Sequence, residues 1–64
     1  MRNEKSILKS NLTREINILT GELNDRKRCY DQFGWLTYLG EPILPQIHRL
    51  QTELSILKFK RRSL

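Results

Sequence analysis

Apolar residues recur at helical spacing in two stretches of the chain, which are separated by a segment containing glycine and proline. In both stretches the steps are three or four residues long. Such steps place side chains on one face of an α-helix, so the pattern predicts two amphipathic helices. The apolar residues are Leu8, Leu12, Ile16, Leu19 and Leu23 in the first stretch, and Ile47, Leu50, Leu54 and Leu57 in the second.

The segment between the two stretches decides where each helix ends. Helical spacing continues as far as Leu39, and Gly40 followed by Pro42 is a common way to stop a helix, although Gly34 could also end it. Proline is tolerated in a first helical turn, so the second helix can begin at this point. The expected elements are a helix over about residues 3–39, a turn over about 40–44 and a helix over about 45–62.

These elements predict an all-α fold, a single helical hairpin over residues 1–64 with one long and one shorter helix. Arms of about 35 and 18 residues would leave an overhang on the order of 25 Å, so residues near 1–20 would have no partner within the chain. A chain this short rarely stabilises itself with one core, and its single cysteine excludes an internal disulfide. We therefore expect assembly into an antiparallel coiled coil or a four-helix-type bundle, with the nine apolar residues above as its interface.

Four of the five aromatic residues fall within nine positions, next to the expected turn. Tryptophan and tyrosine dominate the energetics of many protein interfaces, which favours contact with a partner. The alternative is that these rings close the end of the hairpin by packing on apolar neighbours. The residues are Tyr30, Phe33, Trp35 and Tyr38.

The chain carries a formal charge of +5, and seven of its twelve basic residues form two clusters. Folding about residues 40–45 would bring position 60 near the twenties of the first helix and join the clusters. A joined patch would suit the phosphate backbone of nucleic acid, without sequence-specific readout. The alternative is a solvated helix surface. The residues are Arg26, Lys27, Arg28, Lys58, Lys60, Arg61 and Arg62.

Catalytic chemistry has no support in the sequence. There is no glycine-rich phosphate loop and no metal-spaced cluster, and the seven carboxylates are scattered. We expect no enzyme activity, cofactor, metal or small-molecule substrate. No window approaches the roughly 18 apolar residues that a membrane span needs. Association of the basic ends with a membrane surface is a weaker alternative, because the apolar stripes are narrow seams rather than one broad lipid face. One unpaired thiol and no export signal favour an intracellular location, cytoplasmic or nuclear.

The sequence thus favours an oligomerisation and adaptor module that acts through coiled-coil protein–protein contacts. We expect a homo-oligomer, dimer or tetramer, with a further protein partner. The alternative is a basic helical bundle that binds nucleic acid with sequence-tolerant phosphate contacts. The expected architecture resembles the small dimeric helical hairpins of the Rop type, which bind RNA. The likeness is one of shape, and no residue is carried over on it.

Overall fold

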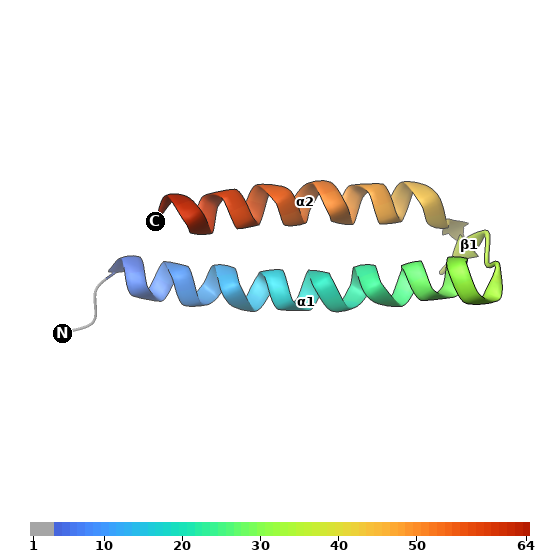
Figure 1. Cartoon of the computed structure of the whole chain (residues 1–64), viewed down its shortest axis with the longest axis horizontal. Coiled ribbons are helices and arrows are strands. Elements are labelled where there is room, and N and C mark those ends of the chain that lie inside the picture. The colour runs from blue at the N-terminus through green and yellow to red at the C-terminus, as the bar shows by residue number, and fades with distance from the viewer. Residues whose placement is uncertain (1–3) are drawn as a thin grey trace.

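The computed structural model describes residues 4–64 as two antiparallel helices joined by a small β-hairpin (Figure 1). The elements are α1 (Glu4–Phe33), β1 (Thr37–Tyr38), β2 (Glu41–Pro42) and α2 (Ile43–Ser63). The molecule measures 49 × 18 × 16 Å. The expected helical hairpin is confirmed, with a two-stranded ladder added at the turn. Residue 3, where the first helix was expected to begin, lies outside the described residues.

α1 ends at Phe33, so the expectation that it would continue to Leu39 is wrong. Gly34 takes a left-handed conformation with φ of 68°, which glycine adopts without a steric penalty. The N–H of Gly34 donates to the carbonyl of Tyr30, and the N–H of Trp35 donates to the carbonyl of Cys29, both at 3.1 Å. These bonds satisfy carbonyls of the last helical turn and close the helix at Phe33.

The chain then reverses in a tight β-hairpin instead of the turn expected over residues 40–44. Tyr38 pairs with Glu41, so Leu39 and Gly40 form a two-residue loop, which we call the hairpin tip. Both tip residues have positive φ, 55° and 79°, as a type I′ turn requires. Leucine is an unusual residue there, because its Cβ crowds the backbone at a cost on the order of 1 kcal/mol.

α2 begins at Ile43, two residues earlier than expected, and ends at Ser63. Pro45 lies in its first turn, where a missing N–H costs no intrahelical hydrogen bond. The N–H of Ile43 donates to the carbonyl of Leu36 at 3.0 Å, which ties the start of α2 to the loop. Basic residues occupy the last turn, where positive charge complements the helix dipole.

The core is a single row of side chains between the two helices. Ile43, which directly follows β2, is completely buried, and the row continues from there along both helices. Partly buried side chains of Leu19, Tyr30, Tyr38 and Leu57 pack against it. The buried apolar residues are Ile16, Leu23, Cys29, Ile43, Ile47, Leu50 and Leu54.

The expected overhang of about 25 Å is wrong, because α2 returns along most of α1 (Figure 1). Near the turn, Arg26 contacts Gln46. Near the open end, the Nη1 of Arg61 donates to the Oγ1 of Thr13 at 3.5 Å. α1 has 30 residues and α2 has 21, so the arms are closer in length than the sequence suggested. Most of residues 4–20 therefore do not need a second chain to find a helical neighbour, and residues 1–3 lie outside the described part of the chain.

Two glycine substitutions should change stability in opposite directions. Gly34→Ala should lower the free energy of unfolding by about 1 kcal/mol, because alanine resists a φ of 68°. Gly21→Ala should raise it by about 1 kcal/mol, because Gly21 is helical and an added Cβ meets nothing within 4 Å. Urea unfolding followed by circular dichroism at one fixed protein concentration measures both. A loss of stability in Gly21→Ala would show that another chain approaches α1 closely at that position.

Candidate functional site

A buried glutamine ties the turn to both helices. Gln46 is 8% exposed. Its Nε2 donates to the carbonyl oxygens of Tyr38 at 2.8 Å and of Glu41 and Pro42 at 3.2 Å. Its Oε1 accepts a hydrogen bond from the Nε of Arg26 at 2.8 Å. One side chain of α2 therefore holds both strands of the β-hairpin and a residue of α1.

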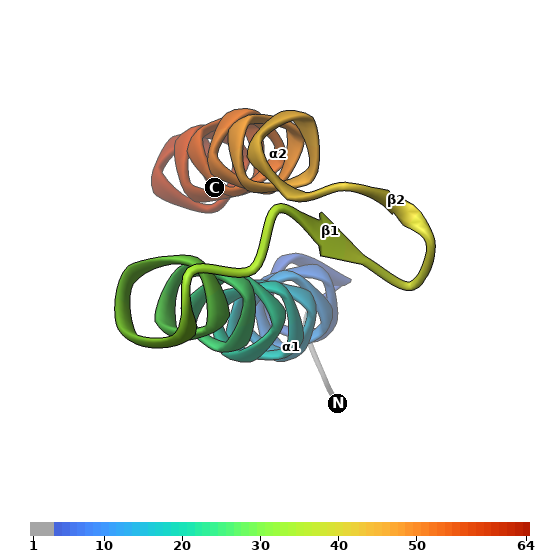
Figure 2. The same ribbon diagram turned by 90° about the vertical axis from the view of Figure 1, so that its right-hand side faces the viewer.

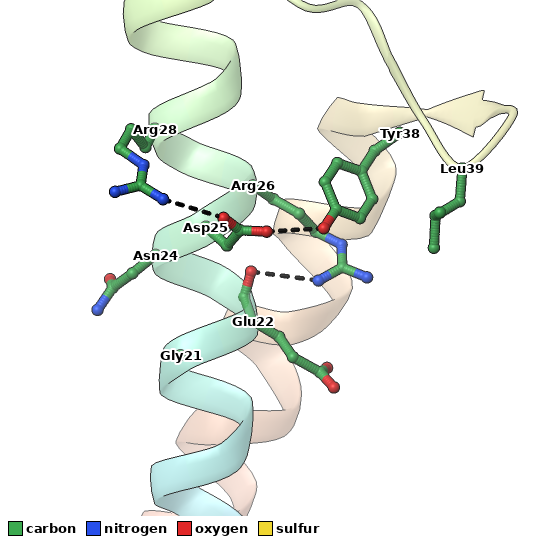
Figure 3. A pocket seen from close by; sticks show the side chains of 8 residues that line it. All are labelled: Gly21, Glu22, Asn24, Asp25, Arg26, Arg28, Tyr38 and Leu39. Carbon is green, nitrogen blue, oxygen red and sulfur yellow. Dashed lines mark hydrogen bonds and ion pairs between the residues drawn. The ribbon is translucent and has the colours of Figure 1, made fainter.

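Tyr38 adds a second connection between the β-hairpin and α1. Its hydroxyl donates to the Oδ2 of Asp25 at 2.7 Å (Figure 3). The guanidinium carbon of Arg26 lies 4.4 Å from the centre of the Tyr38 ring, within cation–π range. We call Asp25, Arg26, Tyr38 and Gln46 the polar clamp. It fixes the β-hairpin to one side of the helix pair (Figure 2).

The Tyr38–Asp25 hydrogen bond also shifts the protonation of both groups. It lowers the pKa of Asp25 below its ordinary value of 3.8, because the hydroxyl stabilises the carboxylate. It raises the pKa of Tyr38 above its ordinary value of 10.0, because the phenol gives up its proton less readily beside a carboxylate. Arg28, 3.3 Å from the other oxygen of Asp25, also favours the ionised carboxylate. The hydrogen bond between Tyr38 and Asp25 therefore contributes its full stabilisation between the ordinary pKa values of the two groups, from about pH 3.8 to about pH 10.0.

The basic residues expected to form one patch are divided between two places. Arg26 belongs to the polar clamp, Arg28 pairs with Asp25, and Lys27 is exposed. Thr13, which Arg61 contacts, is 13 residues before Arg26 on the same helix, or about 20 Å along its axis. The expectation that position 60 would approach the twenties of α1 is therefore wrong. It assumed that α1 was longer and α2 shorter than they are.

A different basic group forms at the open end, where α1 supplies a residue that the sequence clusters did not include. Lys9 joins Lys58, Arg61 and Arg62 around a shallow hollow of about 370 Å³. We call these four residues the basic cluster. Lys60 does not line this hollow. Lys9 can be placed beside the basic residues of α2 only when the register in which α2 returns along α1 is known.

The four aromatic residues separate into two pairs. Tyr30 and Tyr38 pack against the core, as the closing role predicted. Phe33 is 64% exposed and Trp35 is 49% exposed, so these two remain accessible to another molecule. The Trp35 and Tyr38 rings contact each other at a centroid distance of 6.3 Å and an angle of 41°. Closing the end of the hairpin therefore fits Tyr30 and Tyr38, while contact with a partner stays a prediction for Phe33 and Trp35.

The open end of the hairpin also carries an apolar groove of about 450 Å³ on its surface. We call it the terminal groove. Of the nine residues expected at an oligomer interface, Leu8 and Leu12 line it, while the other seven lie in or against the core of one chain. Phe59, 70% exposed, forms part of its wall. The full lining is Leu8, Leu12, Phe59, Lys60, Ser63 and Leu64.

Sequence reasoning missed Gln46, Asp25, Phe59 and Leu39. Gln46 was the most accessible to inference, because it lies three residues after Ile43 and four before Leu50, on the apolar face of α2. A polar residue at such a position needs partners, which the β-hairpin supplies. Leu39 gave no signal, since a type I′ tip is usually marked by asparagine, aspartate or glycine.

Across residues 4–64 there is no group of three or more histidine, cysteine, aspartate or glutamate side chains that could hold a metal ion. Neither helix, as far as the chain is described, has the length and apolar character needed to cross a membrane. The chain matches no family model, no curated protein and no solved structure. Its function must therefore be inferred from the surfaces described above.

Replacing Gln46 tests the polar clamp. Gln46→Glu keeps the shape and the acceptor for Arg26, but it removes the donor shared by three carbonyl oxygens and sets a carboxylate oxygen against them. We expect the free energy of unfolding to fall by about 1–3 kcal/mol at neutral pH. The loss should shrink in acid, where the introduced carboxyl is protonated and can donate again. Gln51→Glu, at an exposed position of the same helix, should have little effect in the same urea titrations.

Proposed function

We propose that this chain is a non-enzymatic oligomerisation and adaptor module in which hairpins pair into an antiparallel coiled coil or a four-helix-type bundle. The observation that supports this proposal is the amount of apolar surface that one hairpin leaves uncovered. Large apolar side chains with 40–85% exposure outnumber the buried ones. They are Ile7, Leu8, Ile18, Phe33, Trp35, Leu36, Leu39, Leu44, Ile56, Phe59 and Leu64.

Single exposed apolar residues are ordinary, but gathered ones are a sign of association. Most of them gather at the two ends of the molecule, around the loop and around the terminal groove, whereas Ile18 and Ile56 lie along the helices. The accessible surface of the chain is 5231 Å². A standard interface covers about 800 Å² per partner, roughly 15% of that surface. A second copy could supply this area along one side of the helix pair.

The adaptor role is supported by the exposed aromatic residues of the loop. Phe33 is the last residue of α1, and Trp35 and Leu36 follow it in the loop, all three exposed. Rigid aromatic side chains at such a position are suited to anchor a protein partner. In a bundle of two hairpins, Phe33 and Trp35 of each chain would remain available to that partner. We place this activity in the cytoplasm or nucleus, where the unpaired thiol of Cys29 would stay reduced.

Light scattering coupled to size-exclusion chromatography tests the assembly. We expect a dimer or tetramer, with an unfolding midpoint that rises with protein concentration. Phe59→Asp should shift the molecule toward monomer, because it places a charge in the terminal groove, while the helical signal of the hairpin is kept. The matched control is Gln51→Asp, which adds the same charge at an exposed position of α2. A wild-type monomer at all concentrations would contradict the proposal.

The basic cluster favours a second candidate function, contact with the phosphate backbone of nucleic acid. Four cations on two helices surround one hollow, so a backbone laid across it could meet several of them at once. Such contacts release counterions and make the affinity strongly dependent on salt. No base-reading element accompanies the cluster, so binding would tolerate many sequences.

Salt titration of binding to random-sequence single-stranded RNA tests this second function. Replacing Lys58 and Arg62 together with glutamine should reduce the slope of log affinity against log salt by about 1.4, which corresponds to two lost phosphate contacts. Replacing Arg14 and Lys27 with glutamine changes the net charge equally outside the cluster and should leave the slope unchanged. Equal slopes in the wild type and the cluster variant would contradict the candidate.

A further inference from the structure

The hairpin tip combines two unfavourable properties in one residue. Leu39 holds a left-handed backbone conformation, which L-residues with a large side chain rarely adopt. Its side chain is also 85% exposed, the highest value among the large apolar residues of the described chain. Asparagine or glycine would form the same turn without strain and without an exposed apolar group. Strained positions that persist are often found where a protein binds something.

The terminal groove lies at the opposite end of the molecule but on the same side of the helix pair. Seven-residue steps keep side chains on nearly the same face of a helix. A second hollow, of about 400 Å³, includes Leu39 of the hairpin tip in its lining. On each helix, one set of positions seven residues apart runs from this hollow to the terminal groove. The positions are Leu12, Leu19 and Arg26 on α1, and Gln46, Glu53 and Lys60 on α2.

We propose that two copies of the chain pair antiparallel along this side, with the tip Leu39 of each copy seated in the terminal groove of the other. This inference rests on the proposed self-assembly and specifies its geometry. A two-fold axis would produce two identical contacts, one at each end. Each chain supplies both the projecting leucine and the apolar groove that receives it. A parallel pair would set tip against tip and would leave both grooves uncovered.

The charges on this side are consistent with the antiparallel arrangement. Glu41 follows the tip directly, and Lys60 lines the terminal groove. Antiparallel pairing brings these opposite charges together at both ends of the dimer. Parallel pairing would set Glu41 against its own copy, which is unfavourable. Lys58 and Arg62 are each two residues from Lys60, so they point about 160° away from it and stay outside the interface.

Leu39→Asn separates the stability of the hairpin from the stability of the dimer. Asparagine suits the turn, so the unfolding midpoint of the monomer at low concentration should rise or stay equal. The dissociation constant of the dimer, measured by sedimentation equilibrium, should increase about tenfold or more, because both copies lose the buried leucine. Leu44→Asn removes an exposed leucine from the other side of α2 and should leave the constant unchanged. An unchanged constant in Leu39→Asn would overturn the proposal.

Cysteine cross-linking tests the arrangement directly. Leu39→Cys and Leu64→Cys are prepared separately, each with Cys29→Ala, and then mixed under mild oxidation. We expect mixed disulfides between the two variants to exceed disulfides within either one. A dimer by light scattering whose Leu39→Cys variant mainly cross-links to itself would overturn this geometry and leave self-assembly intact. A wild-type monomer would overturn both.

Discussion

The hydrogen bonds of Gln46 are the constraint on which the rest of the hairpin depends. The loop between the helices turns back over the core, and its carbonyl groups there need donors. The two N–H groups of one amide nitrogen are shared among three of these carbonyl oxygens, while the amide oxygen holds Arg26 of α1. This arrangement sets the distance between the turn and both helices. It also sets the register in which α2 returns along α1, and hence which residues meet at the open end.

Register explains most of the difference between what could be predicted and what is observed. The helical periodicity of Ile16, Leu23, Ile47 and Leu54 was sufficient to predict two helices and the apolar face of each. It did not show that these residues pack within one chain, because from the sequence they were expected at an interface between chains. It could not decide between Gly34 and Gly40 as the helix end, because both are glycines beside apolar residues that fit a helix. The decision comes from contacts distant in sequence, which hold the β-hairpin in place. Moving the helix end from 39 to 33 shortened α1 and removed the overhang.

Because α1 ends at residue 33 rather than 39, the residues that form the candidate surfaces also differ from those expected. Arg26, at first a candidate for phosphate binding, is engaged by Gln46 and stacks on Tyr38. Lys9, which belonged to no cluster in the sequence, joins the basic residues at the end of α2. The exposed positions of Phe59 and Leu39 could not be predicted from a pattern, since their exposure depends on where α2 ends and how the chain turns. The surfaces that support a function are therefore products of the fold, while the core follows directly from the periodicity.

The contacts between the helices span very different lengths of chain. Arg26 and Gln46 are separated by 20 residues, whereas Thr13 and Arg61 are separated by 48. Closing the longer loop costs more entropy unless the shorter one is already closed. The hairpin therefore forms outward from the turn and frays inward from the open end, where the local free energy of opening is lowest. The width of the terminal groove is consequently its most adjustable dimension, because the two helices can separate there while the clamped end stays closed.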